Sequence, residues 1–136
     1  MALRKATKSR RSAAPPPLHE LESEVMEELW RSGESSVRGL MEALNSDGDK
    51  QRAYTTYMTI MARLHKKGLL SRRREGKSDY YTPAYTRDEY MALRAESEVT
   101  ALVDQYGDVA LSHFAQQMAG LDPARRRALQ RQARKS

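Results

Sequence analysis

Apolar residues recur at helical spacing in two stretches near the start of the chain, which predicts two amphipathic helices. The first covers residues 18–31, and the second covers residues 37–44 with Ser35 or Ser36 as its cap. A polar, turn-rich loop is expected at 45–51. The apolar stripes of the two helices consist of Leu18, Leu21, Val25 and Leu29, and of Val37, Leu40, Met41 and Leu44. Trp30 is expected to be a core anchor.

A third helix and a β-hairpin follow. The third helix covers residues 52–67 and ends at Gly68. Residues 69–74 and 79–83 are β-prone and flank a short turn that contains Gly76, which predicts two antiparallel strands. Three helices followed by a two-stranded hairpin is the element order of a winged helix-turn-helix, in which the third helix enters the DNA major groove.

The two faces of the third helix differ in chemistry. Its predicted core face carries Tyr57, Ile60, Met61 and Leu64, and its opposite face carries Thr55, Thr59, Ala62 and Lys66. Threonine hydroxyls can hydrogen-bond base edges, although ordinary helix-start chemistry also accounts for Thr55-Thr56. Arginines 72–74 and Lys77 of the hairpin are placed to contact phosphates. The DNA-binding candidates are Ser36, Arg52, Tyr54, Thr55, Thr56, Met58, Thr59, Lys66, Arg73, Arg74 and Lys77.

The last third of the chain returns to a helical pattern over residues 87–119, with a break at Gly107. Thr86 and Glu89 form a predicted capping box, and Asp122-Pro123 begins a short final helix. About 45 residues of helix can hardly form an independent core, so a second copy of the chain is the expected cover for their apolar rows. Folding back onto the winged domain is the alternative. The dimerisation candidates are Tyr90, Leu93, Val99, Leu102, Val103, Tyr106, Leu111, Phe114 and Met118.

Charge is strongly segregated along the 136 residues, whose formal net charge is +6. Residues 50–77 hold nine basic residues and one acidic residue, a formal charge of +8, inside an otherwise acidic body. Such a block favours a phosphate backbone as partner, although mutual neutralisation of the blocks is the simpler alternative. Residues 1–17 carry five basic residues and end in three prolines, which predicts a disordered basic arm with a stiff spacer rather than a transit peptide. The domains expected are therefore 1–17, 18–85 and 86–136.

Composition excludes several classes of function. The chain has no cysteine, and its three histidines lie in three different predicted helices without metal-ligand spacing. It has no glycine-rich phosphate loop, so we expect neither a cofactor, nor a metal site, nor catalysis. No apolar run approaches the roughly 20 residues of a membrane span, so a cytoplasmic protein without membrane contact is expected.

Three segments of the chain resemble the penicillinase-repressor family of bacterial regulators, the BlaI/MecI/CopY group. They are LHELESEVMEELW, SVRGLMEAL and AYTTYMTIMARLHKKGLLSRRREGKSDYYTP, which together run from Leu18 to Pro83. The resemblance implies a mainly α protein with a small β-hairpin, a winged helix-turn-helix DNA-binding domain and a C-terminal helical dimerisation region. It also implies a homodimeric repressor that binds pseudo-palindromic operators in double-stranded DNA until an inducer, in some members a regulatory protease, relieves repression.

Two family features are missing from this chain. Copper-responsive members use a cysteine-rich tail, which a cysteine-free chain excludes. The Asn-Phe bond cleaved in β-lactam-responsive members has no counterpart in residues 105–114. A winged-helix protein-interaction module or a non-specific nucleoid-type DNA binder is the alternative function, and the basic block at 50–77 argues against a purely protein-docking role.

Overall fold

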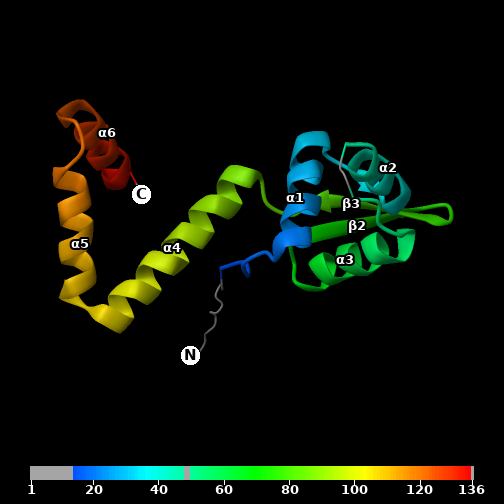
Figure 1. Cartoon of the computed structure of the whole chain (residues 1–136), viewed down its shortest axis with the longest axis horizontal. Coiled ribbons are helices and arrows are strands. Elements are labelled where there is room, and N and C mark those ends of the chain that lie inside the picture. Colours follow the sequence, from blue (N-terminus) through cyan, green and yellow to red (C-terminus); the bar gives the residue numbers. More distant parts are fainter. Residues whose placement is uncertain (1–13, 48–49, 136) are drawn as a thin grey trace. The chain divides into compact units, whose positions relative to one another are not determined.

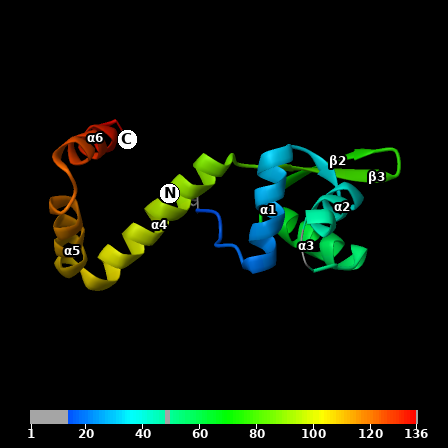
Figure 2. The same cartoon turned by 45° about the horizontal axis from the view of Figure 1, so that its top comes forward.

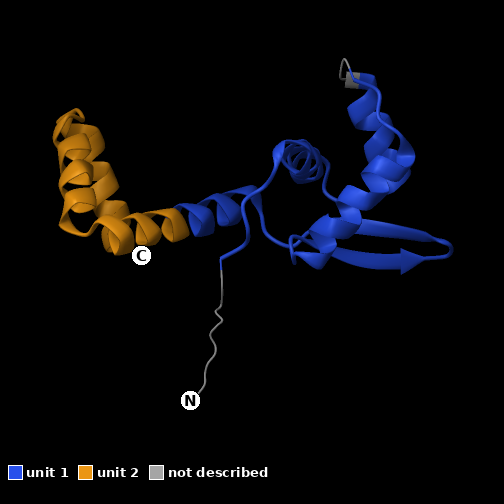
Figure 3. Ribbon diagram, turned by 60° about the horizontal axis from the view of Figure 1, so that its bottom comes forward, with its two compact units in different colours: residues 1–95 blue, residues 96–136 orange. Residues whose placement is uncertain are grey.

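The computed structural model describes residues 14–47 and 50–135 and divides the chain into two compact units, residues 1–95 and 96–136 (Figure 3). The division falls inside a helix, ten residues beyond the boundary that the sequence suggested. Most of the predicted basic arm, residues 1–13, lies outside the described residues. Each unit is considered by itself below.

The chain is mainly helical with one small antiparallel sheet, as the sequence predicted (Figure 1). The elements of the first unit begin with α1 (Glu20–Ser32), β1 (Ser35–Ser36), α2 (Val37–Asp47), α3 (Tyr54–Lys66), β2 (Leu70–Glu75) and β3 (Ser78–Pro83). They are followed by α4 (Arg87–Tyr106), which enters the second unit, and by α5 (Asp108–Ala119) and α6 (Pro123–Arg134). α2 extends three residues into the predicted loop, because Asn45 is held by contacts that no sequence pattern reveals.

The sheet has the strand order β1-β3-β2, and all its pairs are antiparallel. β2 and β3 pair from Leu70↔Pro83 to Glu75↔Ser78, and a two-residue turn joins them in which Gly76 takes a φ of +63°. The hairpin reaches past α2 and α3 in both Figure 1 and Figure 2. β1 was not predicted, because a two-residue strand carries no periodicity and forms only by pairing with β3.

The core of the first unit lies between α1, α2, α3 and the base of the hairpin. The four residues predicted for the core face of α3, Tyr57, Ile60, Met61 and Leu64, are all buried. The Tyr57 hydroxyl donates to Asn45 Oδ1 at 2.8 Å, and the Asn45 amide donates to the backbone carbonyl of Arg52. Asn45 thereby satisfies a buried phenol and ties the end of α2 to the residues that lead into α3.

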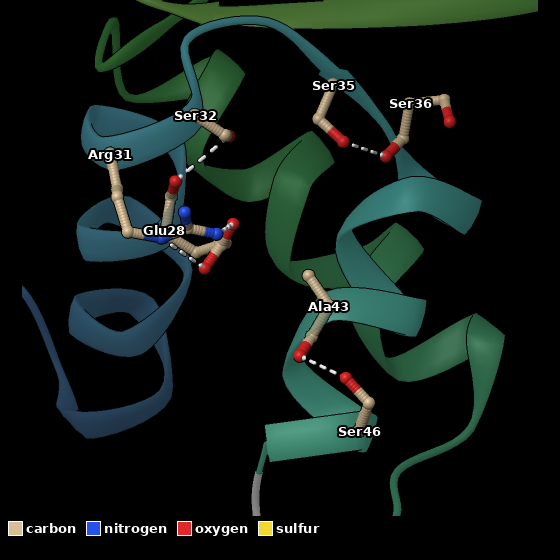
Figure 4. Close-up of polar contacts among 7 residues, drawn as sticks. All are labelled: Glu28, Arg31, Ser32, Ser35, Ser36, Ala43 and Ser46. Atoms are coloured by element: carbon tan, nitrogen blue, oxygen red, sulfur yellow. Dashed lines mark hydrogen bonds and ion pairs between the residues drawn. The ribbon is translucent and has the colours of Figure 1, made fainter.

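Local side-chain contacts fix the ends of α1 and α2 (Figure 4). The Arg31 guanidinium pairs with Glu28 and the Ser32 hydroxyl donates to the Glu28 carbonyl, before Gly33 turns the chain with a φ of +95°. Ser36 is the cap of α2, since its Oγ accepts the Gly39 N–H at 3.1 Å. The chain therefore ends α1 and begins α2 within a few residues, which leaves room only for the short strand β1 between them.

The proline segment and Tyr90 belong to the first core, which corrects two expectations. Pro15 is buried, and the carbonyl of Pro16 accepts the Tyr90 hydroxyl at 3.1 Å, so these two prolines are docked rather than unpaired, whereas Pro17 is exposed. Tyr90 is 6% exposed and lies against Trp30 with ring centroids 5.4 Å apart. Since the first unit covers its side chain, Tyr90 is a core residue and is unavailable to a dimer partner. The Trp30 indole donates to the Tyr85 carbonyl, which makes it an anchor of the kind predicted.

The C-terminal helices follow the predicted breaks. Thr86 and Glu89 form the capping box of α4, with hydrogen bonds of 2.8 and 3.0 Å between backbone and side chain. Gly107 separates α4 from α5 with a φ of +62°, and the Asp122 carboxylate accepts the Ala124 N–H at the start of α6. None of the described helices is long and apolar enough to cross a membrane.

A buried ion pair joins α1 to the end of α3. Glu22 is 1% exposed, and its carboxylate accepts the His19 N–H at 3.0 Å and pairs with Lys67 Nζ at 2.8 Å. Burial by itself raises the pKa of Glu22, but the His19 N–H and the Lys67 ammonium together lower it below its ordinary value. Glu22 is therefore charged in the folded protein, and its stabilising contribution is present above the ordinary carboxyl pKa and lost as the pH falls through the lowered one.

We expect Lys67→Met to lower the free energy of unfolding at neutral pH by about 2 kcal/mol, because it leaves a buried carboxylate without its cation. The loss should shrink as the pH is lowered, since protonated Glu22 no longer needs a partner. Arg87→Met, which removes the partner of Glu27 from a pair exposed on both sides, is the control and should cost no more than about 0.5 kcal/mol. Denaturant unfolding over a pH series measures both, and equal losses in the two variants would contradict the assignment.

Candidate nucleic-acid interface

One face of α3 is free of protein contacts and carries small polar side chains. Thr55, Thr59, Ala62 and Lys66 are all exposed, as the helical spacing predicted, and Tyr54 and Met58 flank them at 41% and 45% exposure. Burial of Tyr57, Ile60, Met61 and Leu64 fixes the rotation of the helix about its axis. The exposed row on the opposite face is therefore directed to solvent. A helix whose exposed face carries small side chains can enter a DNA groove, because these side chains allow its backbone to approach the base edges closely.

Two other candidates at the start of α3 are less accessible. Thr56 is half-buried. The backbone N–H of Arg52 donates to Asn45 Oδ1 at 3.2 Å, and its guanidinium lies 3.4 Å from Glu24 on α1. Arg52 therefore takes part in fixing the chain that leads into the helix.

A hollow of about 160 Å³ lies where α2, α3 and the hairpin turn meet. Ser36, Tyr54, Met58 and Lys77 line it, which brings together candidates that lie up to 41 positions apart in the sequence. Arg38 on α2 also lines it and stacks over the Tyr54 ring, 5.6 Å from its centroid. Sequence analysis did not single out Arg38, because the stacking depends on how α2 crosses α3.

The three consecutive arginines of β2 divide between the two faces of the hairpin. Successive side chains of a strand point to opposite faces, so Arg72 and Arg74 share the face of Leu70, whose side chain enters the core. Arg72 pairs across the ladder with the buried Tyr81, and Arg74 pairs with Asp79, whose carboxylate lies 3.5 Å away. Both guanidinium groups are exposed near the hollow side of the hairpin, together with Lys77 at the turn.

Arg73 points to the other face and is engaged within the protein. It donates to Glu34 through Nε at 3.1 Å and Nη2 at 2.8 Å, contacts Glu75 at 3.1 Å, and stacks over Tyr80 with 4.9 Å to the ring centroid. Glu34 also accepts the Thr82 hydroxyl. The Arg73 guanidinium lowers the pKa of Glu34, and Glu34, followed by Glu75, raises the pKa of Arg73. Arg73, Glu34 and Tyr80 form what we call the wing brace, which joins the hairpin to the residue before β1.

The dimerisation candidates other than Tyr90 lie on α4 and α5. A hollow of about 300 Å³ in the second unit is lined by Leu102, Tyr106, Val109, Ala110, His113 and Phe114. Val109 was not among the predicted dimerisation residues, although at 62% it is the most exposed large apolar side chain of the described residues. Val99, Leu102, Tyr106 and Leu111 are 41–54% exposed, and Leu93, Val103, Phe114 and Met118 are half-buried. Exposed and half-buried apolar side chains therefore recur along both helices.

The described residues contain no group of three or more histidine, aspartate or glutamate side chains that could hold a metal ion. His19, His65 and His113 lie in separate parts of the fold, and His65 contacts Tyr81 edge-on at 6.3 Å. The chemistry of the site is therefore that of exposed hydroxyls and cations, which is suited to phosphates and base edges.

Comparison with known proteins identifies this architecture. The family model of the penicillinase repressor matches residues 18–135. The chain belongs to the penicillinase repressor family. It is 39% identical over 109 residues to the transcriptional regulator BlaI of Mycobacterium tuberculosis, covering 79% of this chain and 77% of that protein. It is 27% identical over 82 residues to the penicillinase repressor of Bacillus licheniformis, covering 60% of this chain and 62% of the relative.

A solved structure supports the same assignment for the first unit. The DNA-binding domain of the repressor BlaI superposes with a TM-score of 0.50 and 27% identity, covering 57% of this chain and 93% of that domain. Membership in the penicillinase repressor family makes the chain a transcriptional repressor with a winged helix, and this family is not enzymatic. The resemblance read from the residues between Leu18 and Pro83 is thereby confirmed.

We expect the wing brace to hold β3 in place, so Glu34→Gln and Arg73→Gln should each speed hydrogen exchange at the amides of Tyr80 and Tyr81. The double variant should exchange little faster than either single variant, because both remove the same contact. Arg72→Gln, one position away on the opposite face, is the control and should leave exchange unchanged. Additive effects of Glu34→Gln and Arg73→Gln would contradict a shared contact.

Proposed function

We propose that this member of the penicillinase repressor family binds operator DNA sequence-specifically, as a homodimer, with α3 in the major groove. The exposed row of Thr55 and Thr59 on α3 carries this proposal, because it is small, polar and opposite a fully buried face. The hairpin beside it supplies cations at Arg72, Arg74 and Lys77. Membership in a repressor family and similarity to the DNA-binding domain of BlaI support the same function.

The candidate residues divide into three roles. Thr55, Thr59, Tyr54 and Met58 are proposed to face base edges, where the threonine methyl groups and hydroxyls can distinguish bases. Cations at the rim of this face are proposed to contact phosphates: Arg38, Lys66, Arg72, Arg74 and Lys77. Ser36, Arg52, Thr56 and Arg73 are proposed to act indirectly, because their polar groups are engaged or half-buried and orient the helix and the wing.

The homodimer is proposed to form through α4 and α5. Leu102, Tyr106 and Phe114 line an apolar hollow, and a second copy is the cover that a two-fold repressor would use. Two copies would present two α3 helices to two half-sites of a pseudo-palindrome. A protein-docking module is the second candidate function, and it predicts no binding to duplex DNA that weakens with salt.

Thr59→Ala is expected to relax operator discrimination by about 1–3 kcal/mol, since it removes a hydroxyl and a methyl group from the base-facing row. The measurement compares binding to the operator and to a mixed-sequence duplex, by fluorescence anisotropy with the full chain. Equal losses on both duplexes would refute a base-reading role for Thr59.

Arg74→Ala is the matched control for that experiment. It should weaken binding to both duplexes alike and flatten the dependence of log K on log salt by about one unit, because it removes a single phosphate contact. A wild-type protein that shows no salt-sensitive binding to any duplex would instead favour the protein-docking module.

Leu102→Asp is expected to produce monomers, because it places a charge in the apolar seam between two copies. Sedimentation velocity measures the oligomeric state directly. Glu96→Asp, a conservative change at an exposed position of α4, is the control and should remain dimeric. A Leu102→Asp protein that sediments as an intact dimer would contradict the proposed seam.

A further inference from the structure

The last helix, α6, is a well-formed helix although it is almost wholly exposed. Asp122 caps it by accepting the Ala124 N–H at 3.0 Å, and Pro123 occupies its first position. The Arg126 guanidinium donates to the Leu121 carbonyl at 3.2 Å, which turns this side of the helix toward its own chain. Arg126 is partly buried, and the other residues of α6 are exposed to solvent.

Four cations gather along another side of the last helix. Arg127, Arg131, Arg134 and Lys135 follow the i, i+4, i+7, i+8 spacing, which places them within about 100° of arc around the helix axis. We call this row the basic stripe. Arg125 lies outside it, roughly 160–180° from Arg127 and Arg134 at 100° per residue. All four side chains of the stripe are exposed.

The stripe has no counter-charge within the described part of the chain. None of the described ion pairs involves an arginine of α6. Four of the five glutamates of α1 already have cations within the first unit, since Glu22, Glu24, Glu27 and Glu28 pair with Lys67, Arg52, Arg87 and Arg31. Four aligned cations repel one another, so the stripe lowers its free energy by meeting a dense external negative charge.

We infer that the basic stripe of α6 is a second DNA-binding site, which contacts the phosphate backbone of duplex DNA without reading sequence. Three of its four cations are arginines, whose planar forks bind phosphates in bidentate fashion. Duplex DNA carries about one charge per 1.7 Å of axis, a density that the scattered carboxylates of α4 do not match. The inference rests on the proposed function, because it assigns this helix to the same duplex that α3 contacts.

A membrane surface is a poorer match to α6. Interfacial helices bury a face of large apolar side chains, and the side of α6 opposite the stripe offers only Leu129 with Ala133. An acidic surface on a second copy of the chain is the alternative partner for the stripe. The crosslinking test distinguishes it from DNA.

The test uses the natural absence of cysteine, so that one introduced thiol carries the only photo-crosslinker in the full chain. Arg131→Cys places the probe on the stripe, and Arg125→Cys places a matched probe off it. With a duplex that carries the operator and mixed-sequence flanks, we expect crosslinks to DNA from position 131 and few from position 125. Crosslinks from 131 to a second protein copy, no crosslinks, or equal yields at both positions would overturn the inference.

Salt dependence gives an independent readout of the same site. Arg131→Gln should flatten the dependence of log K on log salt by about one unit, which reduces the affinity lost between 50 and 200 mM salt by roughly threefold. Arg125→Gln makes the same change in net charge and should leave the slope near that of the wild type. Equal slopes in both variants would count against the stripe. If the wild-type chain binds no duplex, the proposed function fails, whereas duplex binding without these differences refutes the role of α6 alone.

Discussion

The structure of the DNA-binding unit depends on the burial of one face of α3. Tyr57, Met61 and Leu64 are wholly enclosed by α1, α2 and the hairpin base, and this contact leaves the helix a single rotation about its axis. A rotation by one residue would expose a leucine or tyrosine and bury a threonine without a partner, which costs far more than any exposed contact returns. Burial of the apolar face in the core therefore keeps Thr55 and Thr59 exposed on the opposite face of α3.

The wing depends on a different kind of interaction. Beyond Leu70, β2 is exposed along its whole length, and Tyr81 is the buried residue of β3, so apolar burial fixes mainly the base of the hairpin. Pairing with β1 and the contact of Arg73 with Glu34 and Tyr80 replace it. Exposed ion pairs are individually weak, but a bidentate arginine combined with ring stacking and a third strand restricts the hairpin more than any one of them does. Arg72 and Arg74 lie exposed on the other face, where Arg74 is 3.5 Å from the Asp79 carboxylate.

Much of the fold could be predicted from local patterns. Helix periodicity located the helices of the first unit, and cap chemistry located the starts of α2, at Ser35 or Ser36, of α4, at Thr86, and of α6 in the second unit, at Asp122. The pattern could not reveal β1, which exists only as a pair with β3, nor the extension of α2, which depends on Asn45. The same pattern placed Tyr90 in the dimer seam, because helical spacing identifies an apolar position but does not show whether its own chain or a second copy covers it.

The sequence by itself determined which residues of α3 are apolar and which are polar, which segments form helices, and that the basic residues cluster at 50–77. Those properties are local, since they follow from helical spacing and cap chemistry. Only the tertiary structure decided that Arg73 is engaged while Arg72 and Arg74 are exposed, that Arg38 stacks on Tyr54, and that Pro16 holds Tyr90. Each of these is a contact between segments far apart in the chain, and its partner is set by how the elements pack rather than by neighbouring residues.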